Sequence, residues 1–260
     1  MRSLPHRDIG QSLYEALRTG KSITTLTERY PEMSIDDAYK ISLAFLKTRQ
    51  SKNKEVVIGK KIGVTSKPVQ DMLGVFQPDF GFLTNTMLAN DGRVHMDCHV
   101  APRAEAEIAF VLKKGLKGPG VTAKDVLEAT EYVQPCFEIV DSRITDWKIK
   151  IQDTIADNAS CGVFALGAEK VDPKGLNLSK LEVVVEKNAK EISRGKGSAV
   201  QGAPENAVAW LANTLGEYGI PFEAGEIILS GSLVPLEPVV KGDEMLMTIE
   251  GLGECAVAFV

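Results

Sequence analysis

Two glutamates separated by a single alanine lie in the segment PRAEAEIAFVL of this 260-residue chain. If the segment is a β-strand, Glu105 and Glu107 project from one face while the alanines beside them point to the other. Two like charges side by side repel each other, and a divalent cation between them would remove the conflict. Carboxylate oxygens favour Mg²⁺ or Mn²⁺ over zinc, which prefers sulfur and nitrogen ligands. The alternative is a solvated outer face of an edge strand, and these two residues alone do not decide.

A third acidic residue, Glu138, lies inside the otherwise apolar segment YVQPCFEIVD. A carboxylate among apolar neighbours is costly unless it is paired, protonated or bound to a metal. Together with Glu105 and Glu107 it would form a site of three carboxylates that leaves open positions for a substrate. The alternative is a salt bridge from Glu138 to Arg103 or Arg143.

The elements that must position these residues follow from the apolar periodicity. Recurrence every four residues and good N-caps at Ser34 and Thr122 indicate helices. β-branched and apolar runs bounded by Gly, Pro, Asp or Lys indicate strands. The helices are predicted over residues 8–18, 35–50, 123–131 and 204–218. The strands are predicted over residues 56–64, 104–112, 132–140, 181–188, 225–231, 244–251 and 254–260, the first closing on a turn at Gly63.

Strands come in groups rather than alternating strictly with helices, so the pattern predicts an α+β fold and not a doubly wound parallel sheet. We expect a helical N-terminal lobe over residues 1–80 and a β-rich catalytic body over residues 81–260, built as one continuous structural unit. The chain has 30 Lys and Arg against 35 Asp and Glu, a net charge of -5, which argues against a nucleic-acid partner.

The four cysteines lie far apart with no CxxC pair, which gives zinc-ribbon and thioredoxin readings no support. Dispersed thiols suit a reducing compartment, and no window has the length of a membrane span or the pattern of a signal peptide. We therefore expect a cytoplasmic protein with no membrane partner. Trp147 and Trp210 are expected in the core or at a subunit interface.

Several segments resemble the fumarylacetoacetate hydrolase superfamily: PRAEAEIAFVL, CFEIVDSRI, ADNASCG and GEIILSGSLVPLEPVVKGDEMLMTIEGLG. More narrowly, the chain resembles the hydratases that act on 2-hydroxypenta-2,4-dienoate (2-oxopent-4-enoate) in aromatic meta-cleavage pathways. This likeness runs nearly end to end and includes VIGKKIGVTS, GVFQPDFGFLT and DWKIKIQDTIADNASCG. The resemblance implies a mixed β-roll or flattened barrel, a homo-oligomer, and Mg²⁺ or Mn²⁺ held by Glu105, Glu107 and Glu138.

The resemblance also gives roles to Lys61 and Asp79. A lysine at the end of a strand is ordinarily solvated, as we expect for the adjacent Lys60, but the family pattern places Lys61 in the site. There it would stabilise a developing enolate. Asp79 taken alone is typical of a turn. In the resemblance it activates water or moves a proton to carbon.

Three further residues are candidates for substrate binding. Ser160, with nearby backbone amides, would hold the substrate carboxylate, or it is part of a capping turn. Ser230 ends a strand among small residues that let the backbone approach a ligand, and it is the weaker candidate. Arg103 would reach either the glutamates or the substrate carboxylate, and the sequence does not separate the two.

The expected reaction is hydration of 2-hydroxypenta-2,4-dienoate to 4-hydroxy-2-oxopentanoate without an organic cofactor. The alternative is 4-oxalocrotonate decarboxylase, an enzyme of the same pathway. The resemblance implies that this decarboxylase often partners the hydratase, which suggests a complex between the two proteins. The resemblance implies an apolar residue in the decarboxylases where this chain has Asp79. Acylpyruvate hydrolysis would need a histidine–glutamate pair, for which His6 is a poor candidate. A non-catalytic subunit of a decarboxylase complex is the remaining alternative.

Overall fold

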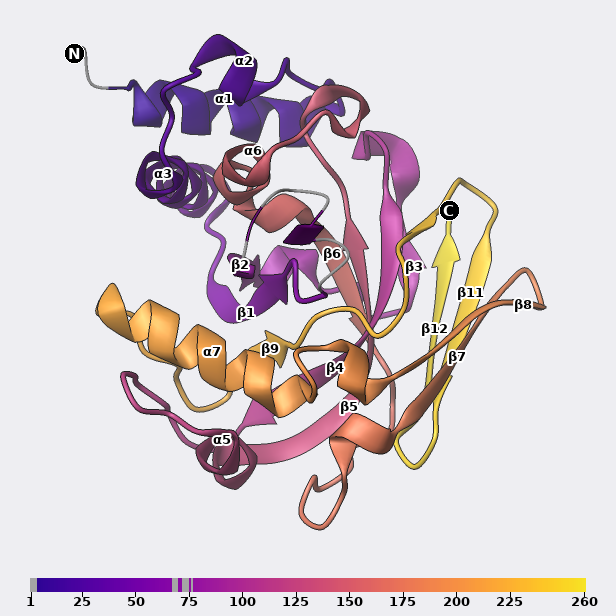
Figure 1. The fold of residues 1–260 in the computed structure, drawn as a ribbon. Helices are drawn as coiled ribbons and strands as arrows, with labels where there is room; N and C mark the ends of the chain where they lie inside the picture. The colour runs from indigo at the N-terminus through magenta and orange to yellow at the C-terminus, as the bar shows by residue number, and fades with distance from the viewer. Residues whose placement is uncertain (1–3, 67–69, 72–74, 76) are drawn as a thin grey trace.

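The computed structural model describes residues 4–66, 70–71, 75 and 77–260. Helices α1, α2, α3 and α6 gather at one end of the molecule, and α5 and α7 lie at the other (Figure 1). The α-helices are α1 (His6–Thr19), α2 (Leu26–Arg29), α3 (Ile35–Asn53), α5 (Ala123–Ala129), α6 (Ile151–Ala156) and α7 (Pro204–Glu217). The 3-10 helices are η1 (Asn85–Met87), η2 (Met96–Cys98), η3 (Thr145–Trp147), η4 (Asn158–Ser160), η5 (Leu178–Lys180) and η6 (Gly197–Ala199).

The four predicted helices are present. Ser34 accepts a hydrogen bond from Asp37 N at the start of α3, and Thr122 accepts one from Asp125 N at the start of α5. The predicted end of the third helix at residue 131 is wrong, because Thr130 already begins a strand. The short helix α6, which precedes the site loop, was not predicted. Within the described residues, no helix is long and apolar enough to cross a membrane.

A seven-stranded mixed sheet carries the predicted glutamates. Its strands follow the order β2-β1-β9-β4-β5-β6, and β10 pairs with β4. β1 and β9 run parallel, while the other neighbours are antiparallel. The strands are β1 (Val57–Gly63), β2 (Asp79–Thr84), β4 (Arg103–Leu112), β5 (Thr130–Val140), β6 (Cys161–Leu166), β9 (Ile227–Leu229) and β10 (Glu237–Pro238).

A second sheet of five strands packs beside the first, in the order β3-β12-β11-β7-β8. Its strands are β3 (Arg93–Val94), β7 (Glu182–Lys187), β8 (Lys190–Lys196), β11 (Glu244–Ile249) and β12 (Gly253–Phe259). All seven predicted strands are present, and the α+β fold class with a curved mixed sheet and N-terminal helices is confirmed. β2, β3, β6, β8 and β10 were not predicted. The division near residue 80 stays a prediction; β1 from the N-terminal part pairs with β9.

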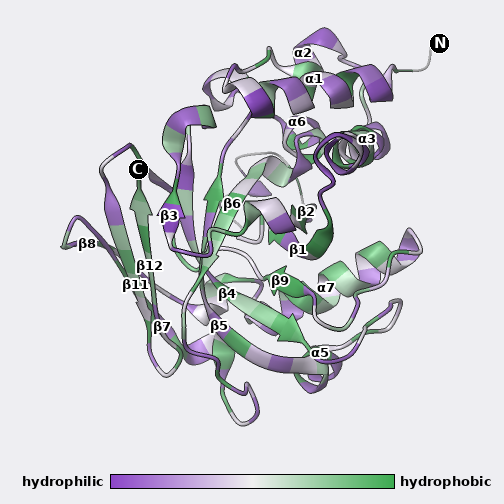
Figure 2. Cartoon of the chain, turned by 180° about the vertical axis from the view of Figure 1, so that it is seen from behind, coloured by the Kyte–Doolittle hydropathy of each residue, from purple (hydrophilic) through white to green (hydrophobic). Residues whose placement is uncertain are grey.

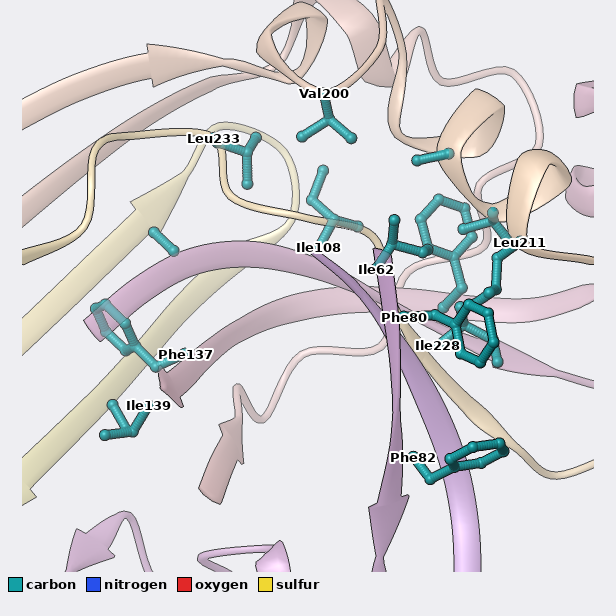
Figure 3. Packing of buried hydrophobic residues seen from close by; sticks show 14 of the residues in the cluster. Ile62, Phe80, Phe82, Ile108, Phe137, Ile139, Val200, Leu211, Ile228 and Leu233 are labelled. Carbon is teal, nitrogen blue, oxygen red and sulfur yellow. The ribbon is translucent and has the colours of Figure 1, made fainter. Parts of the chain in front are cut away.

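Apolar side chains of the hydrophobic core occupy one face of the central strands, so the polar site must lie on the other face. Phe137 and Ile139 on β5 point toward the five-stranded sheet, and Ile62, Ile228 and Leu211 pack together near α7 (Figure 3). The central strands are mainly hydrophobic, while the outer turns of α1 are mostly hydrophilic (Figure 2). Because side chains alternate along a strand, burying these residues turns Glu138 to the opposite face of β5.

Candidate metal and substrate site

The glutamates of β4 and β5 meet through the pairing of these two strands. Glu105 is the direct antiparallel partner of Glu138, and Glu107 lies two residues further along the same face of β4. One carboxylate oxygen from each residue lies within 4.8 Å of the others. Glu107 and Glu138 are fully buried, and Glu105 is partly exposed. The structure therefore brings the three predicted ligands together in a cluster that could hold a metal ion.

The oxygens of this cluster lack the partners that buried carboxylates ordinarily have. Glu107 Oε2 accepts a hydrogen bond from Gly231 N at 2.8 Å, whereas Glu107 Oε1 and both oxygens of Glu138 have none from the described residues. Burial, reinforced by the charge of Glu138, raises the pKa of Glu105 to about 8 and that of Glu107 well above its ordinary range. A divalent cation would satisfy these oxygens and offset the repulsion, so the donor set fits Mg²⁺ or Mn²⁺.

Lys61 lies beside the cluster and supplies a positive charge to it. Its Nζ is 3.3 Å from Glu138 Oε1, and the residue is 2% exposed. Burial alone would lower the pKa of Lys61, but Glu138 and Asp79 outweigh burial and raise it. The ammonium therefore stays charged. The alternative salt bridges from Glu138 to Arg103 or Arg143 are wrong, since Glu138 pairs with Lys61 among the described residues.

The expectation that Lys60 is solvated is also wrong. Lys60 is 2% exposed and pairs with the Glu226 carboxylate and with Pro221 O on the other face of β1. A single residue step along a strand reverses the side-chain direction, so adjacent lysines face two different buried surroundings. The sequence pattern KK did not indicate the partly buried carboxylate of Glu226 near Lys60.

Asp79 is not in a turn but is the first residue of β2, paired with Gly63 at the end of β1. It is 1% exposed, and neither carboxylate oxygen has a hydrogen-bond partner among the described residues. Burial raises the pKa of Asp79 to about 6 against the opposing charge of Lys61. A Cβ on Gly63 would lie 2.3 Å from Asp79 Oδ1. The glycine therefore makes room for this carboxylate beside the lysine.

The loop that contains Ser160 has an unusual backbone and is held from two sides. Asn158, Ala159 and Ser160 all have positive φ values, between 51° and 56°, which non-glycine residues adopt only when their surroundings hold them. The Asn158 side chain bonds Phe82 N at 2.8 Å and Phe82 O at 3.0 Å, which ties the loop to β2. Arg143 Nε donates to Asp157 Oδ1 at 2.6 Å and so holds the residue that directly precedes the loop.

A cavity of about 580 Å³ brings most of the predicted residues to one surface. Lys61, Asp79, Arg103, Glu105 and Ser160 line it, as does the unpredicted Thr154, whose Oγ1 lies 3.2 Å from Ser160 Oγ. Glu107 and Glu138 do not line the cavity themselves, but they belong to the cluster whose third member, Glu105, does.

Two residues differ from their expected places. Ser230 is fully buried and does not line this cavity, although the following Gly231 amide bonds Glu107, as expected of a backbone approaching a site. Trp147 lines the cavity and is only partly buried, so it is not in the core, and its alternative place at a subunit interface stays a prediction. The Arg103 guanidinium carbon lies 4.6 Å from the centroid of the Trp147 ring. Nothing in the spacing of the sequence could have indicated this pair, because 44 positions separate the two residues.

The site and the curved mixed sheet agree with comparisons to known proteins. The family model described as the C-terminal region of fumarylacetoacetate (FAA) hydrolase matches residues 53–260. The chain therefore belongs to the fumarylacetoacetate hydrolase family.

Individual members of the family show which enzymes the chain resembles in sequence and in structure. The chain is 61% identical over 253 residues, 96% of each chain, to the 2-hydroxyhexa-2,4-dienoate hydratase of Comamonas testosteroni. It is 44% identical to the 2-keto-4-pentenoate hydratase of Paraburkholderia xenovorans, over 97% of this chain and 94% of that relative. The solved structure of 4-oxalocrotonate decarboxylase from Pseudomonas putida G7, complexed with magnesium and adipate, is similar with a TM-score of 0.95. That structure has 33% identity and full coverage of both chains.

Proposed function

We propose that the protein is a hydro-lyase that adds water to 2-hydroxypenta-2,4-dienoate (2-oxopent-4-enoate), giving 4-hydroxy-2-oxopentanoate in aromatic meta-cleavage catabolism. The observation that carries this proposal is the identity of 44–61% with hydratases over nearly the whole chain. The decarboxylase has nearly the same backbone but only 33% identity. Since relatives are named for both five- and six-carbon acids, hydration of 2-hydroxyhexa-2,4-dienoate belongs in the same assay.

In this proposal Glu105, Glu107 and Glu138 hold Mg²⁺ or Mn²⁺. The oxygens of Glu107 and Glu138 that have no hydrogen-bond partner among the described residues support that role, as do the raised pKa values of Glu105 and Glu107. The bound cation would supply a Lewis acid for the oxygens of the 2-oxo acid. Gly231 N orients Glu107 through its hydrogen bond, so the backbone after β9 supports the ligand set. Ser230, buried directly before this glycine and outside the cavity lining, stays the weaker candidate for substrate binding.

Arg103 and Ser160, which both line the cavity, bind the substrate carboxylate. Arg103 pairs with none of the glutamates among the described residues, which favours the substrate over Glu105 as its partner. Ser160 offers a hydroxyl on a loop fixed by Asn158 and Arg143. Two fixed donors orient the acid so that its diene extends into the apolar part of the cavity.

Lys61 and Asp79 carry the proton chemistry. The reaction first moves the proton of the 2-hydroxyl group to C5, which gives a 2-oxo-3-enoate. Water then adds its hydroxyl group at C4, and a proton is delivered to C3. Lys61 stabilises the negative charge that develops on the 2-oxygen. Asp79, with its pKa raised to about 6, can accept a proton and return it near neutral pH, which suits a general acid–base group.

The test follows loss of the dienol absorbance by the purified chain, with and without Mg²⁺, and identifies the product by mass. We expect a product heavier than the substrate by one water. Carbon dioxide release from 2-oxohex-3-enedioate would indicate the decarboxylase instead, and cleavage of an acylpyruvate would indicate a hydrolase. A chain that is inactive alone but stabilises a decarboxylase would be a non-catalytic subunit.

The proposed assembly is a homo-oligomer that also forms a complex with 4-oxalocrotonate decarboxylase. The shared fold, with a TM-score of 0.95, is compatible with such a complex. The proposed location is cytoplasmic, in keeping with four free cysteines in the described residues. Sedimentation of the chain alone and with the decarboxylase tests both kinds of assembly.

A further inference from the structure

Arg103 is a cation on the cavity wall that forms no ion pair with a carboxylate of the described residues. It lies two residues before Glu105 on the same face of β4. A flexible guanidinium so close to a cluster of carboxylates would ordinarily turn toward one of them. Instead its central carbon lies 4.6 Å from the centroid of the Trp147 ring, and both residues line the cavity. The stack on the indole therefore competes with the glutamates for Arg103.

Trp147 is held in a backbone conformation that large aromatic residues rarely adopt. Its φ is +52°, and that of the preceding Asp146 is +58°. Such a pair persists only where the surrounding structure fixes it, and it often marks a functional site. The indole Nε1 donates to Ala101 O at 2.9 Å, two residues before Arg103. The ring is thus fastened to the chain segment that leads into the arginine.

The turn that contains Trp147 is braced by a segment from the N-terminal part of the chain. Thr145 N donates to Ile23 O at 3.0 Å, and the hydroxyls of Ser22 and Thr145 lie 2.9 Å apart. Thr25 Oγ1 donates to Lys148 O at 3.0 Å. These bonds enclose the strained residues on both sides. The bracing segment precedes residue 53, where the match to the family model begins.

We infer that Trp147 is a positioning residue that holds the Arg103 guanidinium in the cavity wall, away from Glu105, so that it can receive the substrate carboxylate. This inference rests on the proposed function, because it takes a 2-oxo acid as the ligand. An arginine stacked on an aromatic face keeps its edge N–H groups free for a carboxylate in a two-pronged contact. Without the ring, Arg103 turns to Glu105 and is lost to the substrate.

The test measures binding rather than turnover, with 2-oxopentanoate as a non-reactive probe in the presence of Mg²⁺. The chain contains two tryptophans. In Trp210→Phe, Trp147 is the single tryptophan, and its fluorescence reports binding to a cavity that is otherwise unchanged. Binding to the Trp147 variants is measured by calorimetry. We expect Trp147→Leu to weaken binding about 3- to 30-fold. Trp147→Phe keeps an aromatic face and should stay within about threefold of the wild type. Melting temperatures and Mg²⁺ affinities of both variants should stay near normal.

A double-variant cycle separates positioning from a general packing role. Arg103→Gln should weaken binding about tenfold or more, since it removes a charge-assisted contact. Adding Trp147→Leu to Arg103→Gln should cause no further loss, because the ring acts through the arginine. Lys170→Gln is the matched control: it removes another cation–ring contact, with Lys170 Nζ 4.7 Å from the Tyr132 ring centroid, and should leave binding unchanged.

Two results overturn the inference alone: Trp147→Leu binding the probe like the wild type, or weakening binding equally with and without Arg103. Failure of the wild type to bind 2-oxopentanoate would overturn the proposed substrate class and this inference with it. The wild-type measurement therefore distinguishes the two failures.

Discussion

Lys60 and Lys61 are adjacent on β1 and equally buried, yet their surroundings differ in charge balance. Lys60 pairs with the single carboxylate of Glu226, donates to Pro221 O and lies 5.3 Å from the Phe222 ring centroid. Lys61 faces an excess of carboxylates, several of whose oxygens have no hydrogen-bond partner among the described residues. A balanced buried pair serves structure, whereas an unbalanced cluster is kept for a ligand that completes it.

The buried pair of Arg143 and Asp157 belongs to the balanced kind, although it lies close to the site. Arg143 donates to the Asp157 carboxylate and to the backbone oxygens of Asp141 and Cys161. All of these contacts join β5, β6 and the Ser160 loop. The comparison therefore teaches that distance from the cavity is a poor guide to function, and that unsatisfied oxygens are a better one.

The largest effect should come from Asp79→Asn. The substitution keeps the shape but removes a proton carrier, so kcat and kcat/KM should fall together by about 10²–10⁴-fold. KM and Mg²⁺ affinity should change little, because Asp79 is not a proposed ligand. Asp172→Asn changes an aspartate in an exposed loop and is the control. A fully active Asp79→Asn would remove this residue from the mechanism and weaken the case for hydratase over decarboxylase.

Substituting each lysine by methionine tests the comparison directly. Lys61→Met should lower kcat by about 10²–10³-fold, since it removes a charge beside the developing enolate. Lys60→Met should leave turnover per folded molecule near normal but lower the free energy of unfolding by about 3–5 kcal/mol, because Glu226 loses its buried partner. Denaturant titration and steady-state kinetics on both variants give the result. Equal losses of activity in two folded variants would mean that charge balance does not distinguish them.

Glu107→Gln should weaken Mg²⁺ binding by more than about tenfold. Loss of a residue that only orients a metal ligand already weakens metal binding by about tenfold or more, and Glu107→Gln removes the charge of a ligand itself. Turnover should fall with it, and excess Mg²⁺ or Mn²⁺ should recover part of the loss. Glu131→Gln, on the exposed start of the neighbouring strand β5, is the matched control. Full activity of the wild type after thorough treatment with EDTA would argue against any metal role for the glutamates.

The metal-free protein should lose stability as the pH rises. Burial and the neighbouring Glu138 raise the pKa of Glu105 from 4.5 to about 8, so the folded state keeps a proton that the unfolded chain releases. The folded state therefore binds more protons between these two values, and stability falls through that window. The melting temperature of EDTA-treated protein should decline accordingly, and Mg²⁺ should raise it most at the upper end.

A Glu105→Gln/Glu107→Gln variant controls for groups that titrate elsewhere. Its metal-free melting temperature should vary less with pH than that of the wild type, because two of the three carboxyl groups in the cluster can no longer ionise. An identical slope in both proteins would place the pH dependence outside the cluster.

The sequence predicted those parts of the fold that depend on local periodicity. The shared face of Glu105 and Glu107 follows from strand alternation, and the start of α3 follows from Ser34. The pairing of Asp79 with Gly63 could not be predicted in this way, because a strand pattern shows which side chains share a face but not which strand lies alongside. The burial of Lys60 and the contact between Trp147 and Arg103 could not be predicted for the same reason, because the partners lie on distant segments.

The smallest effect is expected far from both lysines, at the start of α3. Ser34 Oγ accepts a hydrogen bond from Asp37 N at 3.0 Å, and replacing such a cap by alanine lowers stability by about 1 kcal/mol. Separate hydrogen bonds from Ser34 and His6 to the Asp37 carboxylate lower the pKa of Asp37 to about 2, so the stability that these bonds contribute is present above the ordinary value of 3.8 and is lost as the pH falls toward 2. Ser34→Ala should therefore lower the melting temperature at neutral pH by about 2–4 °C, with a smaller difference in acid. KM and kcat should be unchanged, because the cap donates to no group of the site. A change in KM would mean that α3 sets the position of the cavity wall, and the boundary between structural and functional groups would then have to include the N-terminal helices.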